Sequence, residues 1–356
     1  RILHLKKKKK YVKVESGVTI DKLISFLNKN NFHIKCIPGY SQVTIGGAIS
    51  NNVHGKDSLR NGFFCDHVIS CDLINDSGRV KKISTNLCKN ISTLGLVGFI
   101  YSASIKIYSG KLESVHVQSE TYDSLENIHK IYEKSKSKEM SFVWLDGFSK
   151  KNKELLYVEY ADMSKKKLKK KNFRIDIFKY TIFWLIGTLR LQRFFFKNIN
   201  SIFFKFKSLI QKNYITNFSN FYYPHKKIPG FYNLLYPQGF KEVQFFLKIN
   251  YLKNCVREIL ELCKKHKVES YIIGIKFHKK NNQILNYTKN ITASVGFDFD
   301  ILKINKLITN ELVKIIKKYD AQIYFAKDSL FKYGNFSKVQ NINIKKFTKL
   351  KNKFDT

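Results

Sequence analysis

Residues 43–56 read VTIGGAISNNVHGK and differ from the lysine-rich sequence around them. This stretch holds two adjacent glycines and two adjacent asparagines, ends in His-Gly-Lys and carries no carboxylate. Glycine permits a close backbone approach that a β-carbon would block, and exposed amides can then bind a phosphate or a flat ring. The stretch is compatible with an anionic, ring-bearing cofactor, although a double glycine by itself is more often an ordinary tight turn.

The residues on either side of this stretch predict strands and one helix. Residues 11–17, YVKVESG, alternate in the manner of a strand, and the lysine run at 6–10 predicts a solvated turn before it. Thr19 is placed to cap a helix with an apolar face. Residues 67–84 predict a hairpin with its turn at 75–78. The face of the predicted helix consists of Ile20, Leu23, Ile24 and Leu27.

The second part of the chain alternates between strands and helices from about Lys111 onward. Residues 254–267 and 303–320 have the spacing of amphipathic helices, and residues 321–329, AQIYFAKDS, predict a strand that runs into a turn. No internal repeat is visible. The pattern predicts an α+β protein of two lobes.

The net charge of +38 comes from 65 Lys and Arg against 27 Asp and Glu. Such a balance is typical of proteins that bind nucleic acid or anionic membranes. However, the basic residues are scattered, and Lys, Asn, Ile, Phe and Tyr are all frequent together, as an A+T-rich genome would cause. This favours a compositional bias and no nucleic-acid partner.

One basic and aromatic segment, residues 164–212, admits two interpretations. Its apolar and basic residues are interleaved, so a helix here would be amphipathic and suited to a membrane surface. An ordinary packed helix with a loop explains the pattern equally well. The longest uncharged apolar run, Tyr180–Leu189, has about half the length of a membrane span.

Targeting and metal signals are weak in this sequence. Its six cysteines form no CxxC pair and no metal-binding cluster, which favours a reducing compartment and no metal site. We see no signal peptide and predict a cytoplasmic protein or one peripheral at the inner membrane. Because the chain begins at Arg1, we expect its N-terminus to be incomplete.

The order of residues resembles the flavoproteins of the vanillyl-alcohol-oxidase type, and within them the decaprenylphosphoryl-β-D-ribose 2-oxidase group. The double-glycine stretch resembles their V-T-(I/V)-G-G-A-I and H-G-K motifs. Matches follow in the same order along the chain, so the resemblance spans nearly all of it. They comprise Pro38-Gly39, Gly62, Phe64, His67-Val68, residues 94–107, 142–150 and 221–247, and the A-K-D-S motif within 323–329.

The resemblance implies FAD as cofactor and a role for each matching residue. His54, Lys56 and Lys327 would be catalytic, with Lys327 a cation beside the reactive flavin edge or a base. Gln244, Glu242 and Lys327 would bind substrate. The flavin would be lined by Gly39, Thr44, Ile45, Gly46, Gly47, Asn51, Asn52, Val53, His54, Ile100 and Tyr324.

The resemblance also implies a domain plan. A FAD-binding domain of the PCMH type would span 1–115, without the phosphate-binding loop that family members carry at its start. A substrate domain with an antiparallel sheet would span 116–321, and residues 322–356 would return to the FAD domain.

The implied activity is oxidation of a sugar hydroxyl by hydride transfer to the flavin. The substrate that the resemblance implies is the 2-hydroxyl of a polyprenylphosphoryl-β-D-ribose. A separate short-chain reductase would then complete epimerisation to arabinose for the cell envelope, and peripheral membrane contact would suit the lipid-linked substrate.

One departure from the family pattern leaves the substrate open. The chain has Glu242-Val243-Gln244 where family members carry Q-Y-Q, so a carboxylate replaces a neutral amide. A sugar-lactone or alditol oxidase of the same superfamily is therefore an alternative. A non-catalytic remnant is another, and it would bind no flavin.

Overall fold

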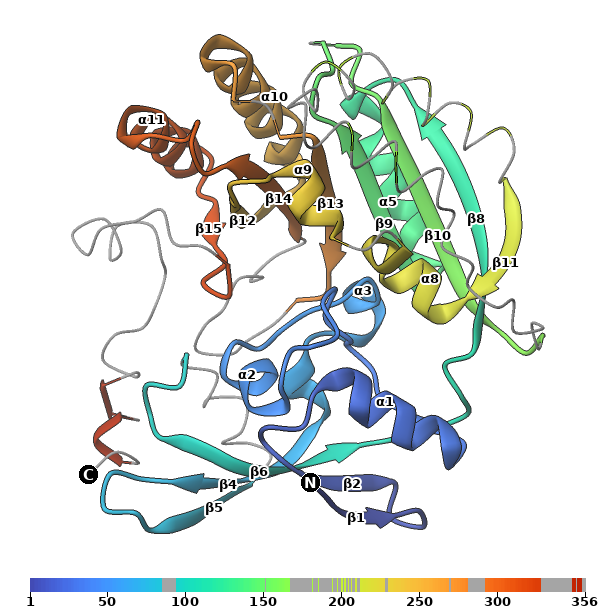
Figure 1. Cartoon of the computed structure of the whole chain (residues 1–356), viewed down its shortest axis with the longest axis vertical. Helices are drawn as coiled ribbons and strands as arrows, with labels where there is room; N and C mark the ends of the chain where they lie inside the picture. Colours follow the sequence, from blue (N-terminus) through green and yellow to red (C-terminus); the bar gives the residue numbers. More distant parts are fainter. Residues whose placement is uncertain are drawn as a thin grey trace. The chain divides into compact units, whose positions relative to one another are not determined.

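The computed structural model groups the chain into two compact units (Figure 1). Unit 1 comprises Arg1–Leu112, His278–Asn290 and Phe336–Thr356, and unit 2 comprises Glu113–Phe277 and Ile291–Asn335. The residues described are 1–84, 94–150, 152–166, 212–227, 230–268, 270–280, 292–327, 348–349 and 351–353, with positions 181, 185, 194, 197, 200, 202, 204, 206 and 209. Much of the basic cluster at 165–171, most of the apolar run at 180–189 and the last residues of the A-K-D-S motif lie outside them.

Unit 1 is built on an antiparallel sheet with the strand order β1-β2-β6-β4-β5. The predicted hairpin is confirmed as β4 and β5, and the lysine run at 6–10 joins β1 to β2. A short ribbon pairs β3 with β7. The strands are β1 Ile2–Lys6, β2 Tyr11–Glu15, β3 Phe32–His33, β4 Val68–Ile74, β5 Val80–Ser84, β6 Phe99–Lys106 and β7 Tyr108–Ser109.

The helices of unit 1 are short, and the first is the predicted one. It begins after Thr19, whose hydroxyl caps no backbone amide and instead donates to Asp21 Oδ1 at 2.5 Å. Its predicted apolar face is buried at Ile20, Leu23 and Leu27. The helices are α1 Ile20–Lys29, α2 Ile45–Ser50, α3 Ser58–Asn61 and the 3-10 turn η1 Phe64–His67.

Unit 2 contains one large sheet, and neighbouring strands with a known register in its described residues run antiparallel, as the sequence predicts for this part of the chain. The strand order is β11-β8-β10-β9-β13-β14-β12-β15. The strands are β8 Ser114–Tyr122, β9 Met140–Asp146, β10 Leu156–Ser164, β11 Asn213–Asn217, β12 Phe240–Lys248, β13 Ile272–His278, β14 Thr292–Asp300 and β15 Gln322–Ile323.

The last strand of this sheet differs from the domain plan. The sequence assigned 322–356 as a whole to the FAD-binding domain. Instead, β15 pairs with β12 through Phe245–Ile323 and Phe246–Gln322, so the described residues 322–327 belong to unit 2. Strand pairing and the contact between Tyr324 and Phe246 hold these residues against β12, although they are close in sequence to the C-terminus.

Both helices predicted for the second part are confirmed, and the first begins five residues earlier than expected, at Ile249. Helix α10 packs on β12 and β14, and α11 packs on α10. The helical elements of unit 2 are η2 Leu125–Asn127, α5 Ile128–Lys136, α8 Phe218–Tyr222, η3 Pro224–Lys227, α9 Phe231–Leu235, α10 Ile249–His266 and α11 Lys306–Lys318. None of the described helices is long and apolar enough to cross a bilayer.

Strand alternation gives the sheet of unit 2 two different faces. One face packs against helices; Tyr132 of α5, for example, contacts Phe277 of β13 edge-on at 5.4 Å. The neighbouring residue Lys276 therefore points to the opposite face, as do Phe142 and Glu242. This second face carries the polar residues considered below.

A buried ion pair ties two distant parts of unit 2 together. The Glu154 side chain is fully buried, and Arg257 of α10 donates to it through Nε at 2.7 Å. The amides of Leu125 and Asn152 also donate to this carboxylate. Burial alone would raise the pKa of Glu154, but the hydrogen bonds from Arg257 and the two amides outweigh burial and hold the pKa below its usual value.

Replacing Arg257 with methionine should destabilise the protein by about 3–5 kcal/mol at pH 7, because it leaves a buried carboxylate without its cation. Glu154 then gains protons more easily, so the loss should shrink as the pH falls toward 4. Urea unfolding from pH 4 to 7 measures both effects. Lys253→Met is the control, because Lys253 pairs with the exposed Glu126 and should cost less than about 1 kcal/mol. An equal loss for both variants, or a loss independent of pH, would contradict this account.

Candidate functional site

The double glycine brings two segments of unit 1 into direct backbone contact. Gly46 lies in the first turn of α2, and its amide donates to Ser16 O at 2.9 Å. A β-carbon at this glycine would lie 2.9 Å from the β-carbon of Ser16, closer than real side chains approach. The flanking pairs Ile45 N to Val18 O and Ile20 N to Val43 O extend the contact. Gly46 thus has a definite steric function.

The polar groups of this turn face outward from the core. Thr44 precedes α2, and its hydroxyl accepts a hydrogen bond from Gly47 N at 3.2 Å. Asn51 closes the helix by donating from Nδ2 to Gly47 O at 3.0 Å. Thr44, Gly46, Gly47 and Asn51 are half-buried, whereas Ile45 packs into the core. Neutral donors and a hydroxyl therefore line one side of the turn.

The Asn52–Lys56 turn is buried, unlike most of this lysine-rich chain. Asn52 has φ +42°, a left-handed conformation that asparagine tolerates, and its Oδ1 accepts from Cys65 N at 3.1 Å. Its Nδ2 is fully buried and has no hydrogen-bond partner among the described residues. Val53, His54 and Lys56 are buried as well. A buried lysine is costly to keep charged and so is rarely placed without a role.

A second histidine, which the sequence did not single out, joins this turn. His278, at the end of β13, is 1% exposed and lies edge-on to the His54 ring at 4.6 Å between centroids. It also stacks on Phe63 at 5.6 Å. In the sequence, His278 stands at the end of an alternating strand. This pattern predicts the face of the sheet on which the side chain lies, but it does not predict the contact with His54.

The two remaining predicted flavin residues of unit 1 differ in exposure. Ile100 is buried in β6, opposite Leu73 of β4, and α2 packs on β6. Gly39 is exposed in the loop that follows Pro38. Ile100 therefore belongs to the same packed region as the double glycine, whereas Gly39 lies at the surface.

These residues fit a FAD group in chemical terms. The Val43–Lys56 stretch offers backbone amides, a hydroxyl and asparagine amides, without a carboxylate to repel a pyrophosphate. The buried, unpartnered Nδ2 of Asn52 is a donor available to a carbonyl or phosphate oxygen. Thr44, Asn51, Asn52, His54 and Lys56 are the polar residues that would hold the group.

In unit 2, the predicted substrate residues lie together on the face of the sheet opposite to the one that α5 covers. Lys327 Nζ forms an ion pair with Glu242 Oε2 at 2.5 Å, and both side chains are about one-third exposed. Gln244, two residues along β12, is buried and donates from Nε2 to Ser294 Oγ at 3.0 Å. The sequence motifs are 85 residues apart, and β12 brings them into contact.

Tyr324 lies beside Gln244 and Lys327 in unit 2. Its amide donates to Gln244 O at 2.9 Å, and its ring lies edge-on to Phe246 at 5.5 Å. The turn that follows places Lys327 N near Tyr324 O at 3.2 Å. Tyr324 therefore positions the lysine, and its predicted contact with the flavin stays a prediction.

Lys276 is a functional candidate that the sequence did not reveal. Burial, together with the nearby charge of Lys327, lowers the pKa of Lys276 to about 8, although Glu242 opposes the change. Its Nζ lies 5.6 Å from the centre of the Phe142 ring. Gly296 lies beside Glu242, since a β-carbon added to Gly296 would lie 3.6 Å from Glu242 Oε1. The result is a cluster of two lysines and one carboxylate.

Replacing Lys276 with methionine should stabilise the protein by about 1–3 kcal/mol at pH 7, because a lysine whose pKa is lowered from about 10.4 to 8 destabilises the fold while it is protonated. The cost falls as the pH rises from 8 to 10, so the gain should shrink over that window. Urea unfolding at pH 7, 8.5 and 10 measures it, and Lys264→Met on the exposed side of α10 is the control. A pH-independent gain would contradict the burial of a charged Lys276.

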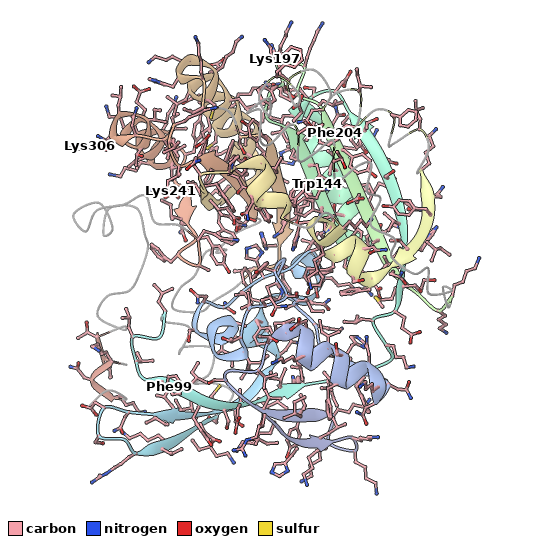
Figure 2. All side chains as sticks on the ribbon, viewed as in Figure 1. Phe99, Trp144, Lys197, Phe204, Lys241 and Lys306 are labelled. Atoms are coloured by element: carbon pink, nitrogen blue, oxygen red, sulfur yellow. The ribbon has the colours of Figure 1, made fainter. Side chains whose placement is uncertain are left out.

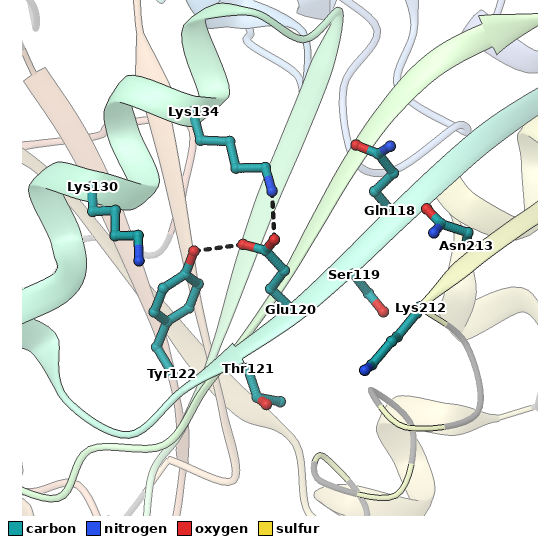
Figure 3. Close-up of a pocket in the computed structure, with 9 residues that line it drawn as sticks. All are labelled: Gln118, Ser119, Glu120, Thr121, Tyr122, Lys130, Lys134, Lys212 and Asn213. Atoms are coloured by element: carbon teal, nitrogen blue, oxygen red, sulfur yellow. Dashed lines mark hydrogen bonds and ion pairs between the residues drawn. The ribbon is translucent and has the colours of Figure 1, made fainter.

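Figure 3 shows a separate concave site on unit 2, between β8, α5 and the start of β11. Lys134 forms an ion pair with Glu120, and the Tyr122 hydroxyl donates to Glu120 Oε2 at 2.5 Å. Burial and the adjacent Glu120 raise the pKa of Tyr122 to about 12. The concave site is lined by Gln118, Ser119, Glu120, Thr121, Tyr122, Lys130, Lys134, Lys212 and Asn213. It contains none of the predicted site residues.

This chain is similar to known proteins both in a comparison with a family model and in comparisons with individual sequences. A family model for the FAD binding domain matches residues 1–84. The chain is 24% identical over 334 residues to a decaprenylphosphoryl-beta-D-ribose oxidase from Mycolicibacterium smegmatis, covering 89% of this chain and 72% of that protein. It is 26% identical over 111 residues to an L-gulonolactone oxidase from Mus musculus, covering 30% of this chain and 25% of that protein.

Proposed function

We propose that this chain, which is similar to FAD-binding flavoproteins of the vanillyl-alcohol-oxidase type, is an oxidoreductase that oxidises a sugar hydroxyl. The observation that carries the proposal is the Lys327–Glu242 ion pair, with Lys276 and Gln244 on the same face of one sheet. Two cations, a carboxylate and an amide can hold a polyhydroxylated ring by several hydrogen bonds. The FAD binding match in residues 1–84 supports the cofactor.

The residues of unit 2 suit the proton side of an alcohol oxidation. FAD, when bound, supplies the acceptor for the hydride that leaves the alcohol carbon. Lys327, held in place by Glu242, donates a hydrogen bond to the substrate oxygen and stabilises negative charge that develops there. With a pKa of about 8, Lys276 is partly neutral at physiological pH and accepts the hydroxyl proton. One hydride and one proton leave, and a ketone results.

The substrate we favour is the 2-hydroxyl of a polyprenylphosphoryl-β-D-ribose. Its support is the likeness to the mycobacterial enzyme, whose name specifies that sugar and which aligns with 89% of the chain. The keto-sugar would then need a separate short-chain reductase to complete epimerisation to arabinose for the cell envelope.

A second candidate is a sugar-lactone or alditol oxidase. Glu242 favours it, because a carboxylate beside Lys327 binds vicinal hydroxyls well and replaces the neutral amide of the first group. The shorter likeness to L-gulonolactone oxidase also supports it.

The test begins with the flavin. The chain should purify yellow, with an FAD absorption band near 450 nm. Anaerobic addition of polyprenylphosphoryl-ribose should bleach the band, and bleaching by soluble lactones or alditols alone would favour the second candidate. Protein that takes up no FAD even from excess cofactor would refute both and favour a non-catalytic remnant.

A further inference from the structure

The segment between β10 and β11 is attached to unit 2 along one side. Among its described positions, those from 194 to 209 are helical. Asn200 Nδ2 donates to Asp146 Oδ1 at 3.0 Å and to Tyr271 O at 3.1 Å. The Phe204 ring stacks on Tyr157 at 5.9 Å, and Figure 2 labels it near Trp144. Asn200 and Phe204 are buried, so they define the side that faces the sheet.

The opposite side of this helical segment presents large apolar residues to solvent. Ile202, Phe206 and Leu209 are 64%, 62% and 70% exposed. Their i, i+4, i+7 spacing places them on one face of a helix, and the two-residue offset of Ile202 and Phe206 from Phe204 turns that face away from the sheet. We call these three residues the apolar stripe. Side chains of this size are seldom left exposed in a row without a partner.

The charge around the stripe indicates what that partner is. Between residues 165 and 212, Asp176 is the sole acidic residue among many lysines and arginines. Lys197, labelled in Figure 2, is exposed on the same helical segment. A second copy of the chain would bring two such basic regions together, and they would repel. An anionic lipid surface supplies the opposite charge for the lysines and an apolar layer for the stripe.

We propose that the apolar stripe inserts into the interfacial layer of a membrane that contains anionic lipids. Lys197 binds a headgroup, and Ile202, Phe206 and Leu209 enter the acyl boundary. The anchoring contacts of Asn200 and Phe204 hold the helix against the sheet, so binding needs no refolding of unit 2. This inference does not depend on flavin chemistry.

The experiment uses the whole chain and extruded vesicles of phosphatidylcholine, with or without about 30% phosphatidylglycerol, in a sedimentation assay. The chain should bind the anionic vesicles and bind pure phosphatidylcholine at least tenfold more weakly. The triple variant Ile202→Gln, Phe206→Gln, Leu209→Gln keeps every charge and should lose tenfold or more in affinity for anionic vesicles. Leu302→Gln with Leu307→Gln is the matched control, because these leucines are 71% and 58% exposed elsewhere in unit 2.

Three outcomes would overturn the proposal. They are no binding of the chain to anionic vesicles, equal binding by the triple variant, and an equal loss in the leucine control. Sedimentation velocity without lipid tests the alternative that a second copy of the chain binds the apolar stripe. A dimer that the triple variant converts to monomer would assign the stripe to a protein interface. Circular dichroism checks that each variant is folded, and Ile202→Gln alone serves if the triple variant is not.

Discussion

Replacing Lys327 with methionine should lower the rate constant of flavin reduction by about 10²–10³-fold, with FAD content unchanged. The change removes the cation that stabilises negative charge on the substrate oxygen, and the loss of one such donor has this size in other enzymes. Methionine keeps most of the side-chain volume, so packing around Tyr324 should be preserved. Anaerobic stopped-flow at 450 nm with the substrate that bleaches the flavin measures the rate directly.

Two variants separate this effect from a loss of charge or of packing. Lys327→Arg keeps a cation next to Glu242 and should recover part of the rate. Lys306→Met removes an exposed charge from α11 and should leave the rate unchanged. If Lys327→Met reduced the flavin as fast as the parent protein, the proposed place of the reaction would be wrong. If it also lost FAD, Lys327 would have a structural function instead.

Replacing Gly46 with alanine should lower the free energy of unfolding by about 1–3 kcal/mol and abolish retention of FAD through gel filtration. The added β-carbon would lie 2.9 Å from the β-carbon of Ser16, so α2 must move away from the turn before α1. Alanine is otherwise the better helix former, which makes a destabilisation diagnostic of this contact. Urea unfolding and the absorbance ratio of flavin to protein measure the two effects.

The chain supplies both a control and a rescue for this prediction. Gly17 lies in the same turn, and a β-carbon added there would meet no described atom within 4 Å, so Gly17→Ala should cost almost nothing. Ser16→Gly removes the atom that the new methyl group meets and should restore stability and FAD retention to Gly46→Ala. Equal effects of alanine at both glycines, or failure of the rescue, would show that the close approach is not the cause.

Local patterns in the sequence predicted several elements, because strand alternation, helical spacing and turn residues act over short distances. The hairpin of β4 and β5 and the helices α1, α10 and α11 are examples. The assignment of residues 322–327 to the FAD-binding domain was wrong, since β15 is only two residues long and its place depends on pairing with β12.

The candidate site was predictable where a motif marked it and not elsewhere. The resemblance named Lys327 and Glu242, and the sheet brings them to 2.5 Å. Lys276 and His278 had no motif, and among so many lysines nothing in composition distinguishes a buried one. The half-buried place of Lys276 depends on contacts between strands, such as the one with the Phe142 ring, and a sequence pattern does not contain them. Likewise, the double glycine predicted a close approach without naming Ser16.

Strand β13 carries Lys276 and His278 on the same side, two residues apart, although the first belongs to unit 2 and the second to unit 1. An extended strand sets their α-carbons about 6.6 Å apart. The backbone of the strand therefore fixes the separation between Lys276 and His278. Substitutions elsewhere can reshape either neighbourhood, but only an insertion or deletion within the strand can change this spacing.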